Sequence, residues 1–494
     1  MTSILNPLRD AKDRRLPRVA GPCSLILFGV TGDLARKKLI PAVYDLANRG
    51  LLPPGFALVG FARQDFGHQE FKALIKRAAK DGARTPWRET VWKQLVAGIR
   101  FVPGEFDDDT AWERLGDTMR ELDEQQGTNG NHAFYLSIPP ALFQVVVSQL
   151  KKHGLATANE GWRRVVIEKP FGHDLASARE LNGILDDVFP PECVFRIDHY
   201  LGKETVQNIL AFRFSNGLFE PVWNRRYLDH VQITVAESIG VGNRGAFYEQ
   251  TGAIRDMIAT HLFQVMTFLA MEPPVSFEPN RLRDETVKVL RSAKRIDPSR
   301  VVRGQYEGYR SEPDVGDDST VETFAAMEVE IDSWRWSDVP FFLRTGKQLQ
   351  AKRSEVTLKY RKVPYNVFRG TDVDLPRRDH LTIRIQPNEG MTIALNAKKP
   401  GPGLELGRVT MDFDYEREFR TQLVDSYQLL LLEAMEGDHT LFLRQDAVER
   451  AWELLMPVLE HPPPVIPYPK GSWGPEEADK LIAPRRWHMS TDVD

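Results

Sequence analysis

Residues 24–35 read SLILFGVTGDLA, a short apolar run that stops at a turn containing two glycines. Such a run is typical of a strand that is buried on both faces. Apolar residues then recur at helical spacing up to Gly50, and residues 56–61 predict the next strand. The helical positions are Leu39, Val43, Leu46 and Ala47. Strand, glycine-rich turn, helix and strand form a βαβ unit, so this stretch predicts a parallel sheet.

The same alternation of strands and helices continues to about residue 204. Strands are expected over residues 132–138, 164–168 and 193–197, and a helix carries Phe143, Val146, Val147 and Leu150. The alternation predicts a Rossmann-like, doubly wound α/β domain, which we place at residues 21–204 after a flexible charged leader, residues 1–20. Pro41, inside the first helical pattern, predicts a kink or a short first turn.

After residue 205 the sequence changes to longer segments with period-two alternation. Strands of this kind are expected over residues 230–235, 323–329, 355–360 and 380–385. They predict a mainly antiparallel sheet with one solvated or half-covered face. Helical stretches are expected near residues 252–271 and 420–436. Together these segments indicate an α+β domain over residues 205–494, whose tail from Pro462 is expected to run over the surface.

Composition and charge limit the class of protein. The 494 residues are 42% apolar and 27% charged with a net charge of -4, which indicates a soluble protein without a nucleic-acid or membrane partner. No signal-peptide pattern is present, and no apolar run reaches the about 18 residues of a membrane helix. Cys23 and Cys193 form neither a metal motif nor a disulfide framework, so we expect buried thiols, no metal and a cytoplasmic location.

The glycine-rich turn is a candidate nucleotide site. A turn between a strand and a helix offers close approach and free N–H groups to a pyrophosphate. The spacing Gly29-x-x-Gly32 lacks one glycine of the G-x-G-x-x-G pattern, so by itself it fits any tight turn equally well. The residues predicted to bind the cofactor here are Gly29, Thr31, Gly32, Asp33 and Leu34.

The end of the second strand bears on the choice of cofactor. NAD enzymes commonly place an acid there, but this chain has Arg63. A guanidinium suits a 2′-phosphate, although a surface arginine explains the residue equally well when it is read alone. We predict NADP as the preferred cofactor, with Asp65 leaving NAD possible as a secondary one.

A ligand site is expected just beyond the strand that ends at Ile197. A histidine beside a carboxylate is suited to take a proton near pH 7, and cations are suited to hold a phosphate. Asp198, His199, Tyr200 and Lys203 offer both within six positions. They follow the carboxyl end of a strand, where open α/β sheets bind ligands.

A second polar cluster, residues 252–261, ends at His261. This histidine lies at the edge of a helical apolar stripe that includes Ile258 and Leu262. Taken alone, it fits a core or boundary histidine better than a catalytic one.

Five segments follow one another along the chain: GVTGDLARKK (29–38), EKPFG (168–172), RIDHYLGKE (196–204), IRDMIATH (254–261) and RTGK (344–347). In order and spacing they resemble the glucose-6-phosphate dehydrogenase family. The resemblance covers about residues 22 to 480, and the nine residues 196–204 are its most specific part.

The resemblance implies roles for single residues. The family's catalytic base corresponds to His261, and the carboxylate that orients it corresponds to Asp198. Residues that hold the substrate phosphate correspond to His199, Tyr200 and Lys203. Other substrate residues correspond to Glu237, Asp256, Lys347, Lys38, Lys352 and Gln386. Cofactor contacts correspond to Arg63, Tyr135 and Lys169.

The resemblance also implies an activity and an assembly. The activity is oxidation of glucose 6-phosphate with hydride transfer to NADP. In the family, the large sheet of the second domain forms a dimer interface, so we expect a homodimer or a dimer of dimers. Some members hold a second, structural NADP near the positions of Arg353 and Arg384. Basic residues on a sheet face are usually solvated, so we do not predict a second nucleotide here.

Two alternatives remain open at this point. Residues 168–170 also resemble the inositol-dehydrogenase-like oxidoreductases, which are shorter and lack the segment 196–204. A non-catalytic NADP sensor would tolerate the loss of His261 or Asp198, but both are present. Residues 344–347 are not a P-loop, because position 341 is Phe and Lys347 is followed by Gln.

Overall fold

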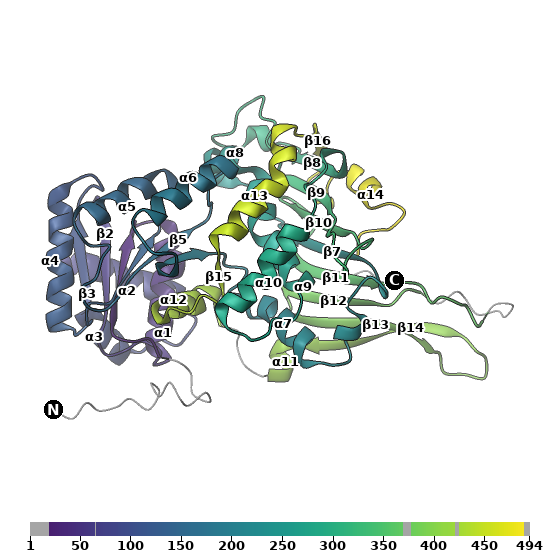
Figure 1. Cartoon of the computed structure of the whole chain (residues 1–494), viewed down its shortest axis with the longest axis horizontal. Helices are drawn as coiled ribbons and strands as arrows, with labels where there is room; N and C mark the ends of the chain where they lie inside the picture. The colour runs from purple at the N-terminus through teal and green to yellow at the C-terminus, as the bar shows by residue number, and fades with distance from the viewer. Residues whose placement is uncertain (1–18, 65, 369–376, 420–423, 489–494) are drawn as a thin grey trace.

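The computed structural model describes residues 19–64, 66–368, 377–419 and 424–488. The predicted leader, residues 1–20, lies almost entirely outside these ranges. Two sheets dominate the structure, one on each side of a layer of helices (Figure 1). None of the helices in the described ranges is both long and apolar enough to cross a membrane.

The first sheet confirms the predicted Rossmann-like fold. Its strand order is β15-β6-β5-β4-β1-β2-β3, and only β15 runs antiparallel to its neighbour. The strands are β1 (Cys23–Phe28), β2 (Phe56–Ala62), β3 (Ile99–Pro103), β4 (His132–Leu136), β5 (Arg163–Glu168), β6 (Val194–Ile197) and β15 (Phe442–Leu443). The chain order reverses between β1 and β4, and a ligand crevice of an open α/β sheet lies at such a point.

Helices connect these strands on both faces of the sheet. They are α1 (Ile40–Asn48), α2 (His68–Gly82), α3 (Glu89–Ala97), α4 (Asp109–Gln125), α5 (Phe143–Lys152) and α6 (Leu175–Asp186). A five-residue π-helix, η2 (Ala35–Leu39), precedes α1. Pro41 is the second residue of α1, but η2 runs into α1 without a break, so the predicted irregularity takes the form of a π-helix before the proline rather than a short first turn.

The second sheet is mainly antiparallel, as predicted. Its order is β14-β13-β12-β11-β7-β10-β9-β8-β16, and only the pairs β10–β7 and β16–β8 are parallel. The strands are β7 (Leu228–Ala236), β8 (Val301–Tyr306), β9 (Phe324–Val329), β10 (Phe341–Gly346), β11 (Arg353–Tyr360), β12 (His380–Gln386), β13 (Gly390–Lys398), β14 (Leu406–Asp414) and β16 (Val465–Tyr468).

Helices of the second half lie mostly between the two sheets. They are α7 (Glu204–Ser215), α8 (Gly245–Ala253), α9 (Phe263–Ala270), α10 (Pro279–Ser292), α11 (Tyr415–Phe419), α12 (Ser426–Glu436), α13 (Gln445–Glu460) and α14 (Glu477–Ile482). The helix expected near residues 252–271 is interrupted by a nine-residue π-helix, η7 (Ile254–Leu262). Short 3₁₀ turns complete the connections at η3 (Pro140–Leu142), η4 (Pro191–Cys193), η5 (Glu220–Val222), η6 (Gly242–Arg244), η8 (Pro298–Arg300) and η9 (Tyr309–Ser311).

Two predictions about the second half hold only in part. The central strands β7 and β10 are buried on both faces rather than half solvated, because the C-terminal segment covers the face opposite the helices. The backbone N–H of His488, for example, donates to Gln232 of β7 at 2.8 Å. The tail after Pro462 does run over the surface, with most of its residues exposed or half-buried, but it also forms β16 and α14 and buries Tyr468 completely.

The two halves are joined by late elements that return to the first sheet. Helix α12 packs on α1, and β15 adds to the edge of the first sheet next to β6 (Figure 1). In this contact Gln428 donates a hydrogen bond to the buried carboxylate of Asp45 at 2.8 Å. The carboxyl ends of β1, β4, β5 and β6 therefore face elements from the second half.

Candidate functional site

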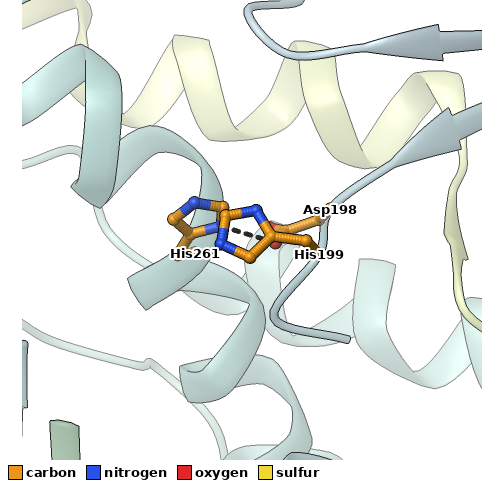
Figure 2. Close-up of side chains that lie close together, drawn as sticks. All are labelled: Asp198, His199 and His261. Carbon is orange, nitrogen blue, oxygen red and sulfur yellow. Dashed lines mark hydrogen bonds and ion pairs between the residues drawn. The ribbon is translucent and has the colours of Figure 1, made fainter. Parts of the chain in front are cut away.

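The end of β6 and the π-helix η7 bring Asp198 and His261 into contact. Nδ1 of His261 lies 2.5 Å from Oδ1 of Asp198, and both side chains are buried (Figure 2). A carboxylate accepts, so we assign the hydrogen to Nδ1, which leaves Nε2 free to accept a proton. The same Oδ1 accepts the backbone N–H of Tyr200 at 2.9 Å. The pair is arranged as a general base with an orienting carboxylate.

Burial keeps the imidazole neutral. The pKa of His261 lies well below its ordinary value because the ring is buried, and the positive charge of Lys169 adds to the effect. Burial raises the pKa of Asp198, although His199 and the Tyr200 amide oppose that shift. The rings of Tyr200 and His199 lie 4.3 Å from that of His261, one stacked and one edge-on. A neutral, oriented imidazole is suited to take a proton near neutral pH.

Asp198, His199 and His261 also lie close enough together to be considered as ligands of a metal ion. Ligand-type atoms of Asp198, His199 and His261 lie within 4.8 Å of one another. Two ligands of one tetrahedral zinc ion, each about 2 Å from it, lie about 3 Å or more apart. The 2.5 Å between Asp198 and His261 is a hydrogen-bond separation instead. The geometry fits a proton-transfer pair, and the prediction of no metal stays a prediction.

A chain of hydrogen bonds joins the residues predicted to hold a phosphate. Nζ of Lys203 donates to Gln386 at 2.7 Å, and the Gln386 amide donates to Ser354 at 3.2 Å. The Ser354 hydroxyl lies 3.4 Å from that of Tyr200. His199, on the same turn, is partly exposed. His199, Tyr200, Lys203 and Gln386 thus surround the predicted phosphate site. Ser354, which carried no signal in the sequence, links Tyr200 to Gln386.

Two further lysines face the predicted phosphate site. Lys38, in η2, and Lys352, just before β11, are both exposed. Burial lowers the pKa of Lys203, and the charges of Lys352 and Lys38 add to the effect, whereas Glu389 opposes it. The site therefore gathers cations from three separate elements, which suits an anionic ligand.

Two ion pairs lie beside the base. Nζ of Lys169 lies 2.8 Å from Oδ1 of Asp256, and Nζ of Lys347 lies 2.5 Å from Oε2 of Glu237. Although burial opposes the shift, Lys169 and then Lys347 lower the pKa of Asp256, so its carboxylate is ionised. Lys169 precedes Pro170 in a cis peptide bond. All four residues come from predictions based on the resemblance, and the structure brings them to one wall of the site.

The glycine-rich turn has the shape a nucleotide turn requires. Gly29 has φ +75°, and a Cβ on it would lie 2.4 Å from the Ser137 carbonyl oxygen. A Cβ on Gly32 would lie 3.1 Å from the Gly29 carbonyl oxygen, so both positions favour glycine. Asp33 is exposed and pairs with Lys37 at 2.8 Å, and its part in cofactor binding stays a prediction. Leu34, which is half-buried, immediately precedes η2.

A hollow of about 630 Å³ adjoins this turn. It is lined by Thr31, Arg36, Arg63 and Gln64, among others. Two guanidinium groups in one hollow suit a phosphate monoester, because each offers paired N–H donors. Arg36 was missed by the sequence analysis, although it lies within the segment 29–38. Asp65 lies outside the described residues.

Tyr135 was predicted to contact the cofactor, and the structure places it in the sheet. It is fully buried, and its hydroxyl donates to Glu168 at 2.5 Å. Burial raises the pKa of Glu168 to about 7, although hydrogen bonds from Tyr135 and Tyr427 and the charge of Lys169 oppose the shift. A contact of the Tyr135 hydroxyl with cofactor stays a prediction. Glu168 was missed as a candidate, although it opens the segment 168–172.

Arg353 and Arg384 lie beside a hollow of about 400 Å³ on β11 and β12. Arg384 donates to the Asn388 carbonyl oxygen at 2.9 Å and lies 3.5 Å from Asp412, and Arg353 lies 3.8 Å from Glu355. Both cations face acidic neighbours, and the absence of a second nucleotide stays a prediction.

Family models cover nearly the whole chain. One, described as the NAD binding domain of glucose-6-phosphate dehydrogenase, matches residues 26–208. A second, described as the C-terminal domain of glucose-6-phosphate dehydrogenase, matches residues 210–488.

Individual relatives agree with these models. The chain is 51% identical to glucose-6-phosphate 1-dehydrogenase 2 of Mycobacterium tuberculosis, over 97% of this chain and 96% of the relative. It is 43% identical to glucose-6-phosphate 1-dehydrogenase of Treponema pallidum, over 96% of each.

Solved structures are similar along the whole length. A glucose-6-phosphate dehydrogenase in complex with its substrate glucose-6-phosphate superposes with a TM-score of 0.88 at 34% identity, covering 96% of this chain and 99% of that one. The glucose-6-phosphate 1-dehydrogenase of Mycobacterium avium superposes with a TM-score of 0.83 at 36% identity, covering 95% and 99%.

Proposed function

Since the chain belongs to the glucose-6-phosphate dehydrogenase family, we infer that its site oxidises D-glucose 6-phosphate to 6-phospho-D-glucono-1,5-lactone with NADP. This is the first step of the oxidative pentose phosphate pathway. The observation that carries the assignment is the 2.5 Å contact between His261 and Asp198 beside a cationic site. A sensor would not need this pair, and the shorter inositol-dehydrogenase-like enzymes lack the segment 196–204.

The substrate phosphate binds at His199, Tyr200 and Lys203. Lys203 is held by Gln386, so its ammonium is in place before the ligand arrives. Lys352 adds a second positive charge from the sheet of the other half. A phosphate anchored here holds the sugar ring against η7.

The sugar ring lies along the wall formed by Glu237, Asp256 and Lys347. The carboxylates of Glu237 and Asp256 accept hydrogen bonds from hydroxyl groups. Each is already oriented by a lysine, Lys347 or Lys169. Such pairs set the direction of the carboxylate oxygens that accept. Lys38 approaches the sugar site from η2.

His261 removes the proton from the C1 hydroxyl. Nδ1 donates to Asp198, so Nε2 receives the proton, and the carboxylate stabilises the imidazolium that forms. Well-placed general bases typically contribute about 10²–10⁴ in rate. The imidazole must lose that proton again before the next turnover.

The cofactor is NADP, with NAD possible as a secondary one. The turn Gly29–Leu34, Arg63 and Lys169 would hold it, with Arg36 as a further cation near the 2′-phosphate. NADP when bound supplies the acceptor for the C1 hydride. The tight glycine turn and the paired guanidinium groups fit this ligand.

One assay tests the activity. Glucose 6-phosphate and NADP are added to the purified chain, and absorbance at the NADPH band is followed. We expect a linear rise that requires the phosphate group of the sugar. A rise with unphosphorylated sugars alone would contradict the substrate, and no rise would contradict the enzyme.

A second copy of the chain covers the outer edge of the large sheet. Within the part of the chain that the structure describes, β14 pairs only with β13, and on it Val409 and Met411 are exposed to solvent. An exposed strand edge with apolar side chains favours pairing. Light scattering of Met411→Lys tests the homodimer or dimer of dimers, since a lower mass than wild type is expected.

Two further assignments complete the proposal. The division between the domains lies at residue 204, where the substrate segment 196–204 ends and α7 begins. The location is cytoplasmic, in keeping with Cys23 and Cys193 both remaining thiols.

A further inference from the structure

The π-helix η7 places two site residues on one face. Asp256 and His261 are five positions apart, and a π-helix closes its hydrogen bonds between residues five apart. Residues at this spacing therefore lie nearly above one another. In an α-helix with 3.6 residues per turn they would point about 140° apart. The reactive face thus depends on the π conformation of this segment.

The first turn of η7 is held by Glu322, which lies just before β9. Oε1 of Glu322 accepts the backbone N–H of Ile254 at 3.1 Å, and its carbonyl oxygen accepts that of Ala253 at 2.9 Å. N–H groups in the first turn have no partner within the helix, and a carboxylate there is favourable. Gly252 has φ +63°, and a Cβ on it would lie 2.5 Å from Oε1, so glycine leaves room for the carboxylate.

Arg303 fixes the carboxylate from the other side. Its Nε and Nη2 atoms donate to Oε2 of Glu322 at 3.1 and 2.8 Å, and Nη1 donates to the Pro463 carbonyl oxygen at 2.8 Å. The side chains are 4% exposed for Glu322 and 12% for Arg303. Removing one member of a buried pair leaves an uncompensated charge, so the two act as a unit.

The neighbouring residue Thr323 holds Lys347, on the same wall of the site as Asp256. Its carbonyl oxygen accepts the backbone N–H of Lys347 at 2.9 Å. The Tyr468 hydroxyl donates to the Lys347 carbonyl oxygen at 2.7 Å and lies 3.0 Å from the Thr323 hydroxyl. Two adjacent residues, Glu322 and Thr323, therefore tie η7 and Lys347 to the same short segment.

We propose that Glu322, clamped by Arg303, is a positioning residue for the reaction. It fixes the first turn of the π-helix η7 and thereby the direction in which Asp256 and His261 face the substrate. It contacts neither substrate nor cofactor. The inference rests on the proposed function, because it takes His261 as the base.

Glu322→Ala in the full chain tests this role, with Glu328→Ala as the matched control. Glu328 lies on the adjoining strand β9 and pairs with Arg300 at the surface, where Nε of Arg300 lies 2.8 Å from its carboxylate. A misplacement of about 1 Å can cost about 100-fold in rate. We expect kcat to fall about 10-fold to 100-fold in Glu322→Ala, with little change in the KM for NADP, and wild-type kcat in the control.

Glu322→Gln and hydrogen exchange separate positioning from folding. The amide keeps an oxygen for only one of the two donors, Ile254 or Arg303, so kcat should lie between wild type and Glu322→Ala. Amides of residues 252–262 should exchange faster in both variants, whereas the sheet around β1 should exchange as in wild type. If Glu322→Ala exchanged faster only here but kept wild-type kcat, or if β1 exchanged faster too, the proposal would be overturned.

The proposed function fails in a different way. Full activity of His261→Asn would show that His261 is not the base. The exchange result for the Glu322 variants would still stand. Exchange over residues 252–262 reports on the Glu322 contact whatever the role of His261.

Discussion

Nδ1 of His261 lies 2.5 Å from Oδ1 of Asp198, although the two residues are 63 positions apart in the chain. One comes from a π-helix of the second half and the other from the end of a strand of the first. Because the contact crosses between the halves, the proton abstraction that we propose depends on how the two halves pack.

Replacing His261 tests the base. His261→Asn should lower kcat by about 10²–10⁴-fold with little change in the KM for glucose 6-phosphate, because the base acts on the bound substrate. Asp198→Asn should also lower kcat, because the amide stabilises the imidazolium less well than the carboxylate does. Steady-state kinetics with both substrates varied measures the effects. His153→Asn, at a half-buried histidine beside Asp109 in the first domain, is the control. A near-normal kcat for His261→Asn would refute the assignment.

The pH dependence of kcat/KM reports the state of His261 in the free enzyme. Only the neutral ring accepts a proton, so activity is lost as pH falls through its pKa. Burial, aided by Lys169, lowers that pKa, so the acid limb should lie below pH 6.5. Lys169→Ala removes a nearby positive charge, and the limb should move upward. Lys151→Ala is the control and should leave the acid limb where it is in the wild type. An acid limb that did not move in Lys169→Ala would contradict the effect of Lys169 on the pKa of His261.

Lys203 tests the phosphate site. Charge-assisted hydrogen bonds contribute about 1.5–3 kcal/mol, so Lys203→Ala should raise the KM for glucose 6-phosphate about 10-fold to 100-fold. The effect on kcat should be smaller. Gln386→Ala should raise the same KM less, since it releases Lys203 without removing its charge. Kinetics at fixed saturating NADP measures both, and an unchanged KM in Lys203→Ala would count against the site.

Arg63 tests the choice of cofactor. Arg63→Ala should raise the KM for NADP by about 10-fold or more, and that for NAD much less, because only NADP carries the 2′-phosphate. Arg77→Ala, at an exposed position of α2, removes the same charge away from the turn and should change neither. Equal losses for both cofactors in Arg63→Ala would exclude this role.

Glu168 links stability to pH. Its pKa in the folded chain, about 7, lies above its ordinary value of 4.5 because the side chain is buried. The folded state therefore favours the protonated form, and this contribution is fully present below pH 4.5 and lost as pH rises through about 7. The loss amounts to about 3 kcal/mol, because each pKa unit corresponds to about 1.4 kcal/mol.

Glu168→Gln removes this ionisation. Its Tm should fall less between pH 5 and pH 8 than that of the wild type. Glu180→Gln, an exposed position on α6, should behave like the wild type. Calorimetry at the two pH values makes the comparison, and parallel Tm curves for Glu168→Gln and wild type would show that Glu168 does not titrate in this range.

Local sequence patterns accounted for much of the first half. The apolar run at residues 24–28 and the glycines at 29 and 32 predicted β1 and its turn, because a buried strand and a tight turn each leave a local signature. Strand positions were recovered to within two residues at β2, β4, β5 and β6. In the second half, no strand was predicted in the tail after Pro462, because β16 is a short strand that depends on pairing with β8.

The candidate site, like the fold, could be predicted from the sequence only in part. The segment 196–204 and the resemblance identified the residues of the site, since their types and order are properties of the chain itself. Their arrangement was decided by tertiary structure. No local pattern predicted that η7 is a π-helix, or that Ser354 links Tyr200 to Gln386.

The sequence by itself determined a βαβ start, a nucleotide turn and a segment rich in phosphate-binding and proton-accepting groups. The resemblance implied that Asp198 orients His261 and not the more conspicuous His199, but only the tertiary structure brought the two side chains to 2.5 Å from each other. The physical reason is that a hydrogen bond across 63 positions depends on the packing of η7 against the end of β6. That packing arises from many contacts distant in sequence, each too weak to leave a pattern of its own.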